Sequence, residues 1–248
     1  ARGSLPLDAM LSCGADEAFA IKGPRGRTAL AVALSNQTAR MRWLWACDEA
    51  TLALFEEAAG PCLEALQAAT GRPMLLYAAC FVALRGARLA EEESAWHVDY
   101  EHERIPSGAA FTCLAPLRPL PSSVGGLQYQ PWGARDLRGG PPAAPVAQTV
   151  RHEEGAYTLL DGKLRHRTEP FVYQHLASEA ELCDAYEASG HLRVLASLSI
   201  ASAERRLEPC VREVLEGMAP PAALVRRSPE APAVGQAQAV GPRGGWRL

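Results

Sequence analysis

The leading part of the chain carries apolar patterns that predict one strand followed by helix. The run "RTALAVALS" at 27–35 suits a strand, and a polar stretch follows it. Asp48 is a typical helix N-cap, and apolar residues recur after it at helical spacing as far as Gly71. One face of this segment carries Leu52, Phe55 and Ala59. Gly60–Pro61 interrupts the pattern, so we expect a pair of helices here.

From Met74 onward the apolar runs shorten to lengths that suit strands. Asp161–Gly162 lies between two of these runs and predicts a hairpin. Many short strands without regular βαβ alternation predict a mainly β fold with flanking helices, arranged as an antiparallel sandwich or barrel. The runs cover residues 74–84, 95–100, 109–117, 125–130, 156–160, 163–168 and 192–200.

Two segments interrupt the predicted strands, and two more follow them. Residues 130–148 are too rich in proline and glycine for regular structure and predict a long loop. Residues 178–190 begin with Ser178 and Glu181 in capping-box spacing, which predicts a short inserted helix. A final helix is predicted from the helical spacing of Leu207, Val211, Val214 and Leu215. We therefore expect a single domain over 1–226 and a flexible tail over 227–248.

Charge and cysteine usage limit the classes of partner and compartment. A formal net charge of -3 and a pI near 6.1 give no overall attraction to nucleic acid or to an anionic membrane. No apolar run reaches the roughly 18 residues that a membrane span needs. Seven scattered cysteines without a CxxC pair indicate reduced thiols. We expect an intracellular protein, in the cytoplasm or an organelle, with a small-molecule or peptide substrate.

His97 and Asp99 are the first candidates for chemistry. On a strand, residues two positions apart point to the same face, so an imidazole and a carboxylate converge here. A polar surface strand would give the same pattern, and the neighbouring charged stretch 101–103 favours that alternative. A metal site therefore needs a third ligand from elsewhere.

His166 is the candidate for that third ligand. It lies late in the predicted strand 163–168, where Arg165 and Arg167 alternate to the opposite face. A second imidazole added to a His-x-Asp pair would complete a facial triad that leaves coordination positions open for substrates. The remaining histidines are expected to face solvent: His152, His175 and His191.

Four stretches together resemble the Fe(II)- and 2-oxoglutarate-dependent dioxygenases, especially the prolyl 4-hydroxylase-like branch. These stretches are "WHVD", a strand opened by "GG", "LLDGKLRHRTEP" and "RVLASLSI", and the resemblance covers about residues 74–200. It implies a double-stranded β-helix, or jelly roll, with His97, Asp99 and His166 as iron ligands. It also implies hydroxylation of a C–H bond with O2, release of succinate and CO2, and it allows for ascorbate. The carboxylate of Asp99 disfavours halogenation, since halogenating members carry a small residue there.

The resemblance further implies a cation for the far carboxylate of 2-oxoglutarate. Arg193, which opens a late strand, is the candidate, because a guanidinium binds a carboxylate bidentately. Ser197 shares its face, although the family usually carries the hydroxyl two residues after the arginine, where this chain has Leu195. The separation of His166 from Arg193 is also longer than usual. Tyr77 is either a co-substrate contact or a half-buried core residue.

Substrate contacts and alternative functions stay open at this point. Trp96 and Trp132 line a substrate mouth or pack in the core, and the segments 130–148 and 178–190 are expected to select the substrate. A cupin-like metalloenzyme could use the same three ligands for isomerisation or other non-oxidative chemistry, without a need for Arg193. A catalytically silent jelly-roll binding module is the other alternative. Hydrolase, nucleotide-binding and metalloprotease motifs are absent from the sequence.

Overall fold

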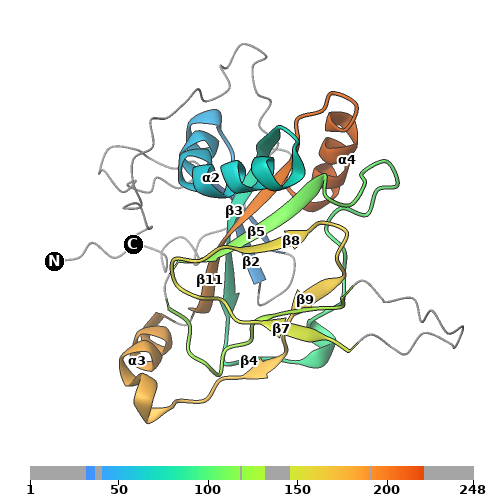
Figure 1. The fold of residues 1–248 in the computed structure, drawn as a ribbon. Helices are drawn as coiled ribbons and strands as arrows, with labels where there is room; N and C mark the ends of the chain where they lie inside the picture. The colour runs from blue at the N-terminus through green and yellow to red at the C-terminus, as the bar shows by residue number, and fades with distance from the viewer. Residues whose placement is uncertain (1–31, 37–40, 118, 132–145, 190, 221–248) are drawn as a thin grey trace, which may run out of the picture.

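The computed structural model describes residues 32–36, 41–117, 119–131, 146–189 and 191–220, drawn in colour in Figure 1. Three expectations from the sequence lie outside the described residues: Trp132, most of the loop 130–148 and the tail 227–248. The side chains of 32–36 and of 185–192 are likewise not described.

The strands form one larger and two smaller antiparallel sheets (Figure 1). The larger sheet has the order β1 (Val32–Asn36), β2 (Met41–Ala46), β3 (Met74–Arg85), β11 (His191–Ser202), β5 (Ala110–Pro116) and β8 (Thr158–Asp161). The three-stranded sheet has the order β7 (Gln148–Val150), β6 (Leu127–Tyr129) and β9 (His166–Thr168). A third sheet pairs β10 (Phe171–Val172) with β4 (Arg88–Leu89).

The chain winds back and forth between the larger and the three-stranded sheet. After β3 it bridges to β9 at His97, returns to β5, crosses to β6 and β7, and returns to β8; it then crosses to β9 and ends in β11. The two sheets pack through a leucine cluster from β5, β6, β8 and β11: Leu114, Leu127, Leu160 and Leu195. This winding confirms the predicted mainly β fold of jelly-roll type, built from two facing sheets and not as a closed barrel.

Helix α2 (Glu49–Thr70) covers the outer face of the larger sheet. It begins as predicted, because the carboxylate of Asp48 accepts a hydrogen bond from Thr51 N at 2.6 Å, and it ends at Gly71 with φ 66°. The predicted break at Gly60–Pro61 is wrong, since the helix is continuous. A proline inside a helix costs about 3 kcal/mol, and burial of the helix face on both sides of Pro61 offsets it. That face comprises Leu52, Phe55, Ala59, Cys62, Leu63 and Leu66.

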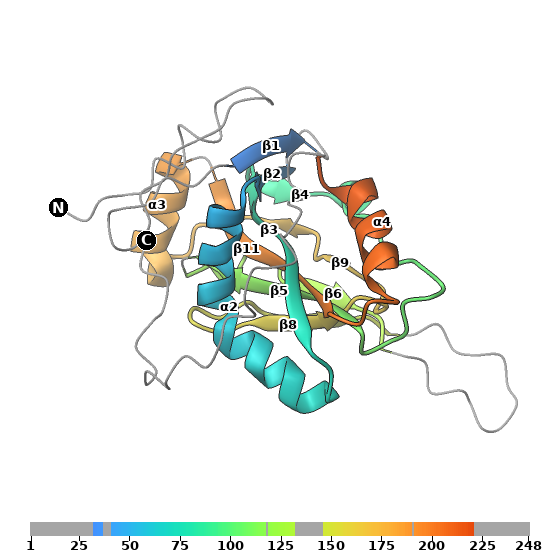
Figure 2. The same cartoon turned by 90° about the horizontal axis from the view of Figure 1, so that it is seen from above.

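Two further helices follow the sequence predictions. Helix α4 (Glu208–Met218) packs beside β3 on the side away from α2 (Figure 2), with Val211 and Leu215 buried. Helix α3 (Ala180–Ser189) follows a 3-10 turn at Ala177–Glu179 and is inserted between β10 and β11. No described helix has the length and apolar character needed to cross a membrane.

Asp161–Gly162 forms a corner between sheets, so the predicted hairpin is wrong. β8 pairs with β5, whereas β9 pairs with β6. Gly162 N donates to Ala110 O at 2.8 Å, and Gly162 O accepts from Tyr100 N at 3.0 Å. A Cβ on Gly162 would lie 2.3 Å from the Tyr100 ring, so glycine serves this close approach. The dipeptide separates two strands as expected, but the second strand belongs to the other sheet.

The described cysteines are all free thiols, as expected, and Cys62 and Cys113 approach with their sulfur atoms 3.5 Å apart between α2 and β5.

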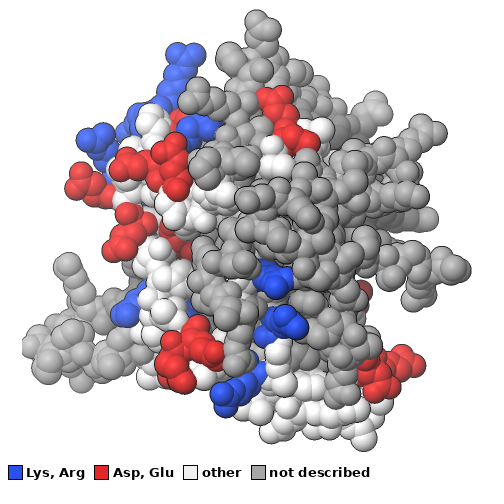
Figure 3. Space-filling view, turned by 180° about the vertical axis from the view of Figure 1, so that it is seen from behind, with Lys and Arg blue, Asp and Glu red and all other residues white. Residues whose placement is uncertain are grey.

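Charged side chains of both signs are interspersed on the face seen in Figure 3, where the described residues form no patch of a single sign. The absence of a nucleic-acid partner stays a prediction.

Candidate metal centre

His97 and His166 are brought together by a pair of backbone hydrogen bonds. His97 N donates to His166 O at 3.0 Å, and His166 N donates to His97 O at 2.9 Å. Directly opposed residues in an antiparallel pair share one face, so both imidazoles point the same way. The predicted strand 95–100 is reduced to this single bridge, because the chain turns at Asp99–Tyr100. The turn leaves the carboxylate of Asp99 beside both rings.

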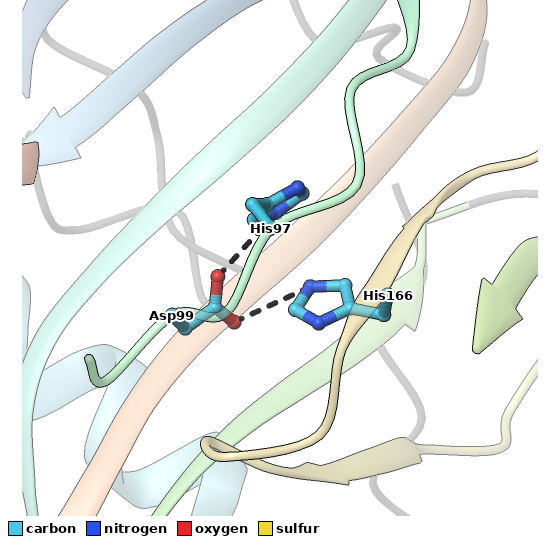
Figure 4. Close-up of side chains that lie close together, drawn as sticks. All are labelled: His97, Asp99 and His166. Carbon is cyan, nitrogen blue, oxygen red and sulfur yellow. Dashed lines mark ion pairs between the residues drawn. The ribbon is translucent and has the colours of Figure 1, made fainter. Parts of the chain in front are cut away.

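The three predicted ligands converge on one point (Figure 4). Their candidate ligand atoms all lie within 4.8 Å of one another. Asp99 Oδ1 is 3.5 Å from His97 Nε2, and Asp99 Oδ2 is 3.5 Å from His166 Nε2. Two imidazole nitrogens and one carboxylate in this arrangement can hold a divalent metal ion.

Hydrogen bonds orient all three side chains from behind. His97 Nδ1 lies 3.0 Å from Ala95 O, and His166 Nδ1 lies 2.9 Å from Leu164 O. Each Nδ1 therefore carries the proton and donates it, which leaves the lone pair of each Nε2 directed to the shared point. The hydroxyl of Thr112 on β5 donates to Asp99 Oδ2. Such outer contacts are what fixes the ligands of a metal site.

Burial differs across the triad. The side chain of His166 is 6% exposed and that of Asp99 14%, while that of His97 is 53% exposed. Burial lowers the pKa of His166, so its imidazole is neutral near pH 7, as a ligand must be. The site therefore has a closed side at His166 and an open side at His97.

Arg193 lies on the same inner face as the triad and is buried. Its Nη1 donates to Thr168 Oγ1 at 3.0 Å, and Thr168 follows His166 by two residues on β9. The guanidinium thus lies about 6–7 Å farther along the strand than the third ligand, from the rise per residue. Burial lowers the pKa of Arg193 to about 10, and the group remains a cation at neutral pH.

The three other cations close to His166 in the sequence point elsewhere. Arg165 is exposed, and Lys163 Nζ donates to His102 O at 2.7 Å. Arg167 lies on the opposite face of β9, as its parity predicted, where it pairs with Glu91. Of these four cations, only Arg193 faces the interior between the two sheets.

His152 was missed as a site residue, and the expectation that it faces solvent is wrong. Its Nε2 lies 3.1 Å from Arg193 Nη2, and its Nδ1 lies 3.3 Å from Thr158 Oγ1. Burial, and secondarily the charge of Arg193, lowers the pKa of His152 to about 3. Its sequence neighbourhood, at the exit of a proline-rich loop, gave no signal of this contact. His175 is exposed, as predicted.

The weaker candidates are not grouped with the triad by any described contact. Ser197 is buried on the inner face of β11 and hydrogen-bonds the thiol of Cys80. Tyr77 packs in the cluster under α4, and its hydroxyl donates to Ser202 O at 3.2 Å. The ring of Trp96 lies under the guanidinium of Arg167, 4.6 Å away, on the opposite side of the chain from His97.

Comparisons with known proteins give similar structures but no sequence relative. No family model matches the chain, and no curated protein matches it. SnoN from nogalamycin biosynthesis, described as a non-heme α-ketoglutarate-dependent epimerase, is similar with a TM-score of 0.46 and 16% identity over 69% of this chain. EctD from S. alaskensis is similar with a TM-score of 0.47 and 17% identity over 85% of this chain. AviO1 from Streptomyces viridochromogenes Tue57 has a TM-score of 0.42 and 15% identity over 80% of it.

These structures are longer than the matched region. The match covers 66% of the SnoN chain, 69% of EctD and 78% of AviO1. SnoN is also described in complex with Fe3+ and α-ketoglutarate, and EctD with bound Fe. TM-scores below 0.5 assign no activity to this chain, and they do not confirm a prolyl 4-hydroxylase-like branch. The similar structures thus include enzymes described by the cofactors that the sequence resemblance implies, while the function of this chain has to follow from its own residues.

Proposed function

We propose that this chain is an Fe(II)- and 2-oxoglutarate-dependent oxygenase. His97, Asp99 and His166 are the residues that would hold the iron, because two neutral imidazoles and one carboxylate on one face form the ligand set of that class of site. Arg193 would bind the far carboxylate of 2-oxoglutarate. When bound, iron with this co-substrate and O2 supplies oxidation of a C–H bond, with release of succinate and CO2.

The observation that carries the proposal is the placement of Arg193. A buried guanidinium is costly unless an anion or several acceptors offset its loss of hydration. Among the described residues no carboxylate pairs with it, and its Nε has no hydrogen-bond partner. It contacts Thr168, which is two residues beyond His166 on β9, and this separation suits a five-carbon dicarboxylate whose other end reaches the triad. A non-oxidative cupin-like enzyme would have no use for this cation.

The residues of the chain define what the site does around the metal. Asp99 supplies the one negative charge of the ligand set, and Thr112 holds its carboxylate in place. The exposed ring of His97 indicates the side on which a primary substrate would approach. Hydroxylation is the outcome we favour, since a ligating carboxylate at position 99 leaves no room for halide. The substrate would be a small molecule or a peptide, selected by α3 and the segment 130–148, and ascorbate would serve as an accessory reductant.

Release of succinate from 2-oxoglutarate tests the proposal. Slow conversion of 2-oxoglutarate to succinate can be measured without the primary substrate, so that substrate need not be known. We expect succinate with Fe(II) and O2, none from Asp99→Ala, and a raised KM for 2-oxoglutarate in Arg193→Met. Arg165→Met is the matched control, because that arginine is exposed, and it should behave as the unaltered protein. Tight metal binding without 2-oxoglutarate binding would favour a non-oxidative enzyme, and no metal binding would favour a binding module.

A further inference from the structure

We propose that His152 is a positioning residue that holds Arg193 in the orientation needed to bind the far carboxylate of a dicarboxylic 2-oxo acid. The inference rests on the proposed function and deepens it, since it assigns a residue that sets the preference for 2-oxoglutarate over shorter 2-oxo acids. His152 reaches Arg193 from the segment between β7 and β8, far from it in sequence.

The hydrogen bonds fix the protonation state of His152 by exclusion. A guanidinium only donates hydrogen bonds, so His152 Nε2, 3.1 Å from Arg193 Nη2, must be the acceptor. The ring proton then resides on Nδ1, which donates to Thr158 Oγ1 at 3.3 Å. The chain Thr158–His152–Arg193 is thus ordered in one direction, with a neutral imidazole in the middle.

Neutral partners hold the guanidinium without cancelling its charge. Thr168 binds Nη1 and His152 binds Nη2, so two contacts fix the plane of the fork. A carboxylate in place of either would quench the cation and compete with an incoming anion. The full positive charge of Arg193 therefore stays available, and its remaining donors are held in a set direction. This arrangement favours an acid that carries a second carboxylate.

His152 also lines a cavity of about 200 Å³. The other lining residues are Leu120, Pro121, Ser122, Val124, Gly125, Gly126 and Arg151. Because one ring both lines this space and contacts Arg193, shortening His152 would open the space toward the guanidinium and admit water to it. An isosteric apolar change is therefore the sharper test than truncation to alanine.

Binding of two 2-oxo acids to Mn(II)-loaded protein separates the anchor from the metal. Calorimetric titration with 2-oxoglutarate and with 2-oxobutyrate, which lacks the second carboxylate, gives a ratio of Kd values. We expect His152→Leu to weaken 2-oxoglutarate about tenfold, the loss of one charged hydrogen bond, and to leave 2-oxobutyrate unchanged. His152→Gln can place an oxygen near the position of Nε2 and should restore most of the loss. Exposed His175→Leu is the matched control.

Thr158→Val gives a second, milder probe on a partly exposed strand residue. It removes the acceptor for His152 Nδ1 and should weaken 2-oxoglutarate severalfold without affecting 2-oxobutyrate, even where His152→Leu fails to fold. Equal weakening of both acids, or no change in either, would overturn the role of His152 while Arg193→Met still abolishes the preference. Absence of any preference in the unaltered protein would remove the proposed function as well.

Discussion

The two faces of β11 differ in chemistry although they belong to one strand. Between Val194 and Ile200, the face toward α2 is entirely apolar and consists of Val194, Ala196, Leu198 and Ile200. The face toward the three-stranded sheet alternates with it and consists of Arg193, Leu195, Ser197 and Ser199. Both faces are buried, so exposure does not distinguish them. The outer face contributes apolar burial alone, whereas the inner face combines apolar burial at Leu195 with polar groups whose burial is costly.

This difference indicates how the fold supports a site. Packing of α2 on the outer face holds β3, β11 and β5 in place from behind. Their inner residues can then keep groups such as Arg193, whose burial without a carboxylate opposes folding. Substitutions on the outer face should therefore reduce stability with little direct effect on binding. Substitutions of polar residues on the inner face should weaken binding with little loss of stability.

The largest effect is expected on the outer face, at Phe81. This residue is 2% exposed, and its ring centroid lies 5.0 Å from that of Phe55 on α2. Phe81→Ala should lower the free energy of unfolding by about 3–5 kcal/mol, from lost burial plus the cavity left behind. Urea unfolding measures this loss. Val172→Ala, at a position 66% exposed, should change stability by less than about 0.5 kcal/mol. A loss of metal affinity in folded Phe81→Ala protein would contradict the division between the faces.

The next effect is expected at Arg193 and has the opposite character. Arg193→Met should weaken 2-oxoglutarate binding roughly ten- to a hundredfold, since it removes charge-assisted hydrogen bonds. Its stability should stay the same or rise, because a buried cation without a carboxylate is replaced by an apolar side chain of similar length. Calorimetry and urea unfolding on the same samples test both parts. A stability loss comparable to that of Phe81→Ala would show that Arg193 is mainly structural.

A smaller effect is expected at Thr112, one position from the outer-face residue Cys113. Thr112→Val removes the hydroxyl that donates to Asp99 Oδ2 and nearly conserves the shape. Metal affinity should fall about tenfold, the lower range for an outer contact of a metal ligand. Thr112→Ser keeps the hydroxyl and should retain affinity, measured by competition with a metal-binding dye. Equal affinity in both variants would indicate that Asp99 needs no such support.

The triad could be predicted from the sequence because alternation along a strand determines which side chains share a face. His97 and Asp99 share a face through spacing alone, and His166 was placed by its position late in a strand, with Arg167 turned away as its parity required. The predicted strand over 95–100 was wrong in one detail, since these residues form a single bridge and a turn. The geometry survives because the pair of bonds between His97 and His166 sets the shared face without a longer ladder.

Other features depend on contacts that are distant in sequence. β2 was missed because its first residues continue a polar stretch, and it is recognised only by pairing with β1 and β3. Continuity of α2 through Pro61 reflects packing on the sheet, which local propensity does not contain. The chain direction at Gly162 is set by Tyr100 and Ala110. The hydrogen bond between His152 and Arg193 joins residues 41 positions apart, and the sequence around neither residue indicates it.

The last expected effect concerns His152 and the pH dependence of stability. The pKa of this residue is about 3 in the folded chain, against an ordinary value of 6.5, because the ring is half-buried beside Arg193. Between these values the unfolded chain binds more protons than the folded one. The contribution of neutral His152 to stability is therefore fully present above pH 6.5 and is lost as the pH falls toward 3. The slope approaches about 1.4 kcal/mol per pH unit for one proton.

His152→Gln removes this titration but keeps an acceptor for Arg193. Metal-free protein unfolded in urea at pH 7.5, 6 and 5 should therefore lose stability less steeply in this variant, by about 1 kcal/mol per unit below pH 6. The lowered pKa of His166 acts in the same direction but is present in both proteins, so it cancels in the difference. His175→Gln, at an exposed position, should follow the unaltered protein. Parallel curves for His152→Gln would mean that His152 has the same pKa in the folded and the unfolded chain. The ring would then become cationic below about pH 6.5, and a cationic imidazole could not accept a hydrogen bond from Arg193.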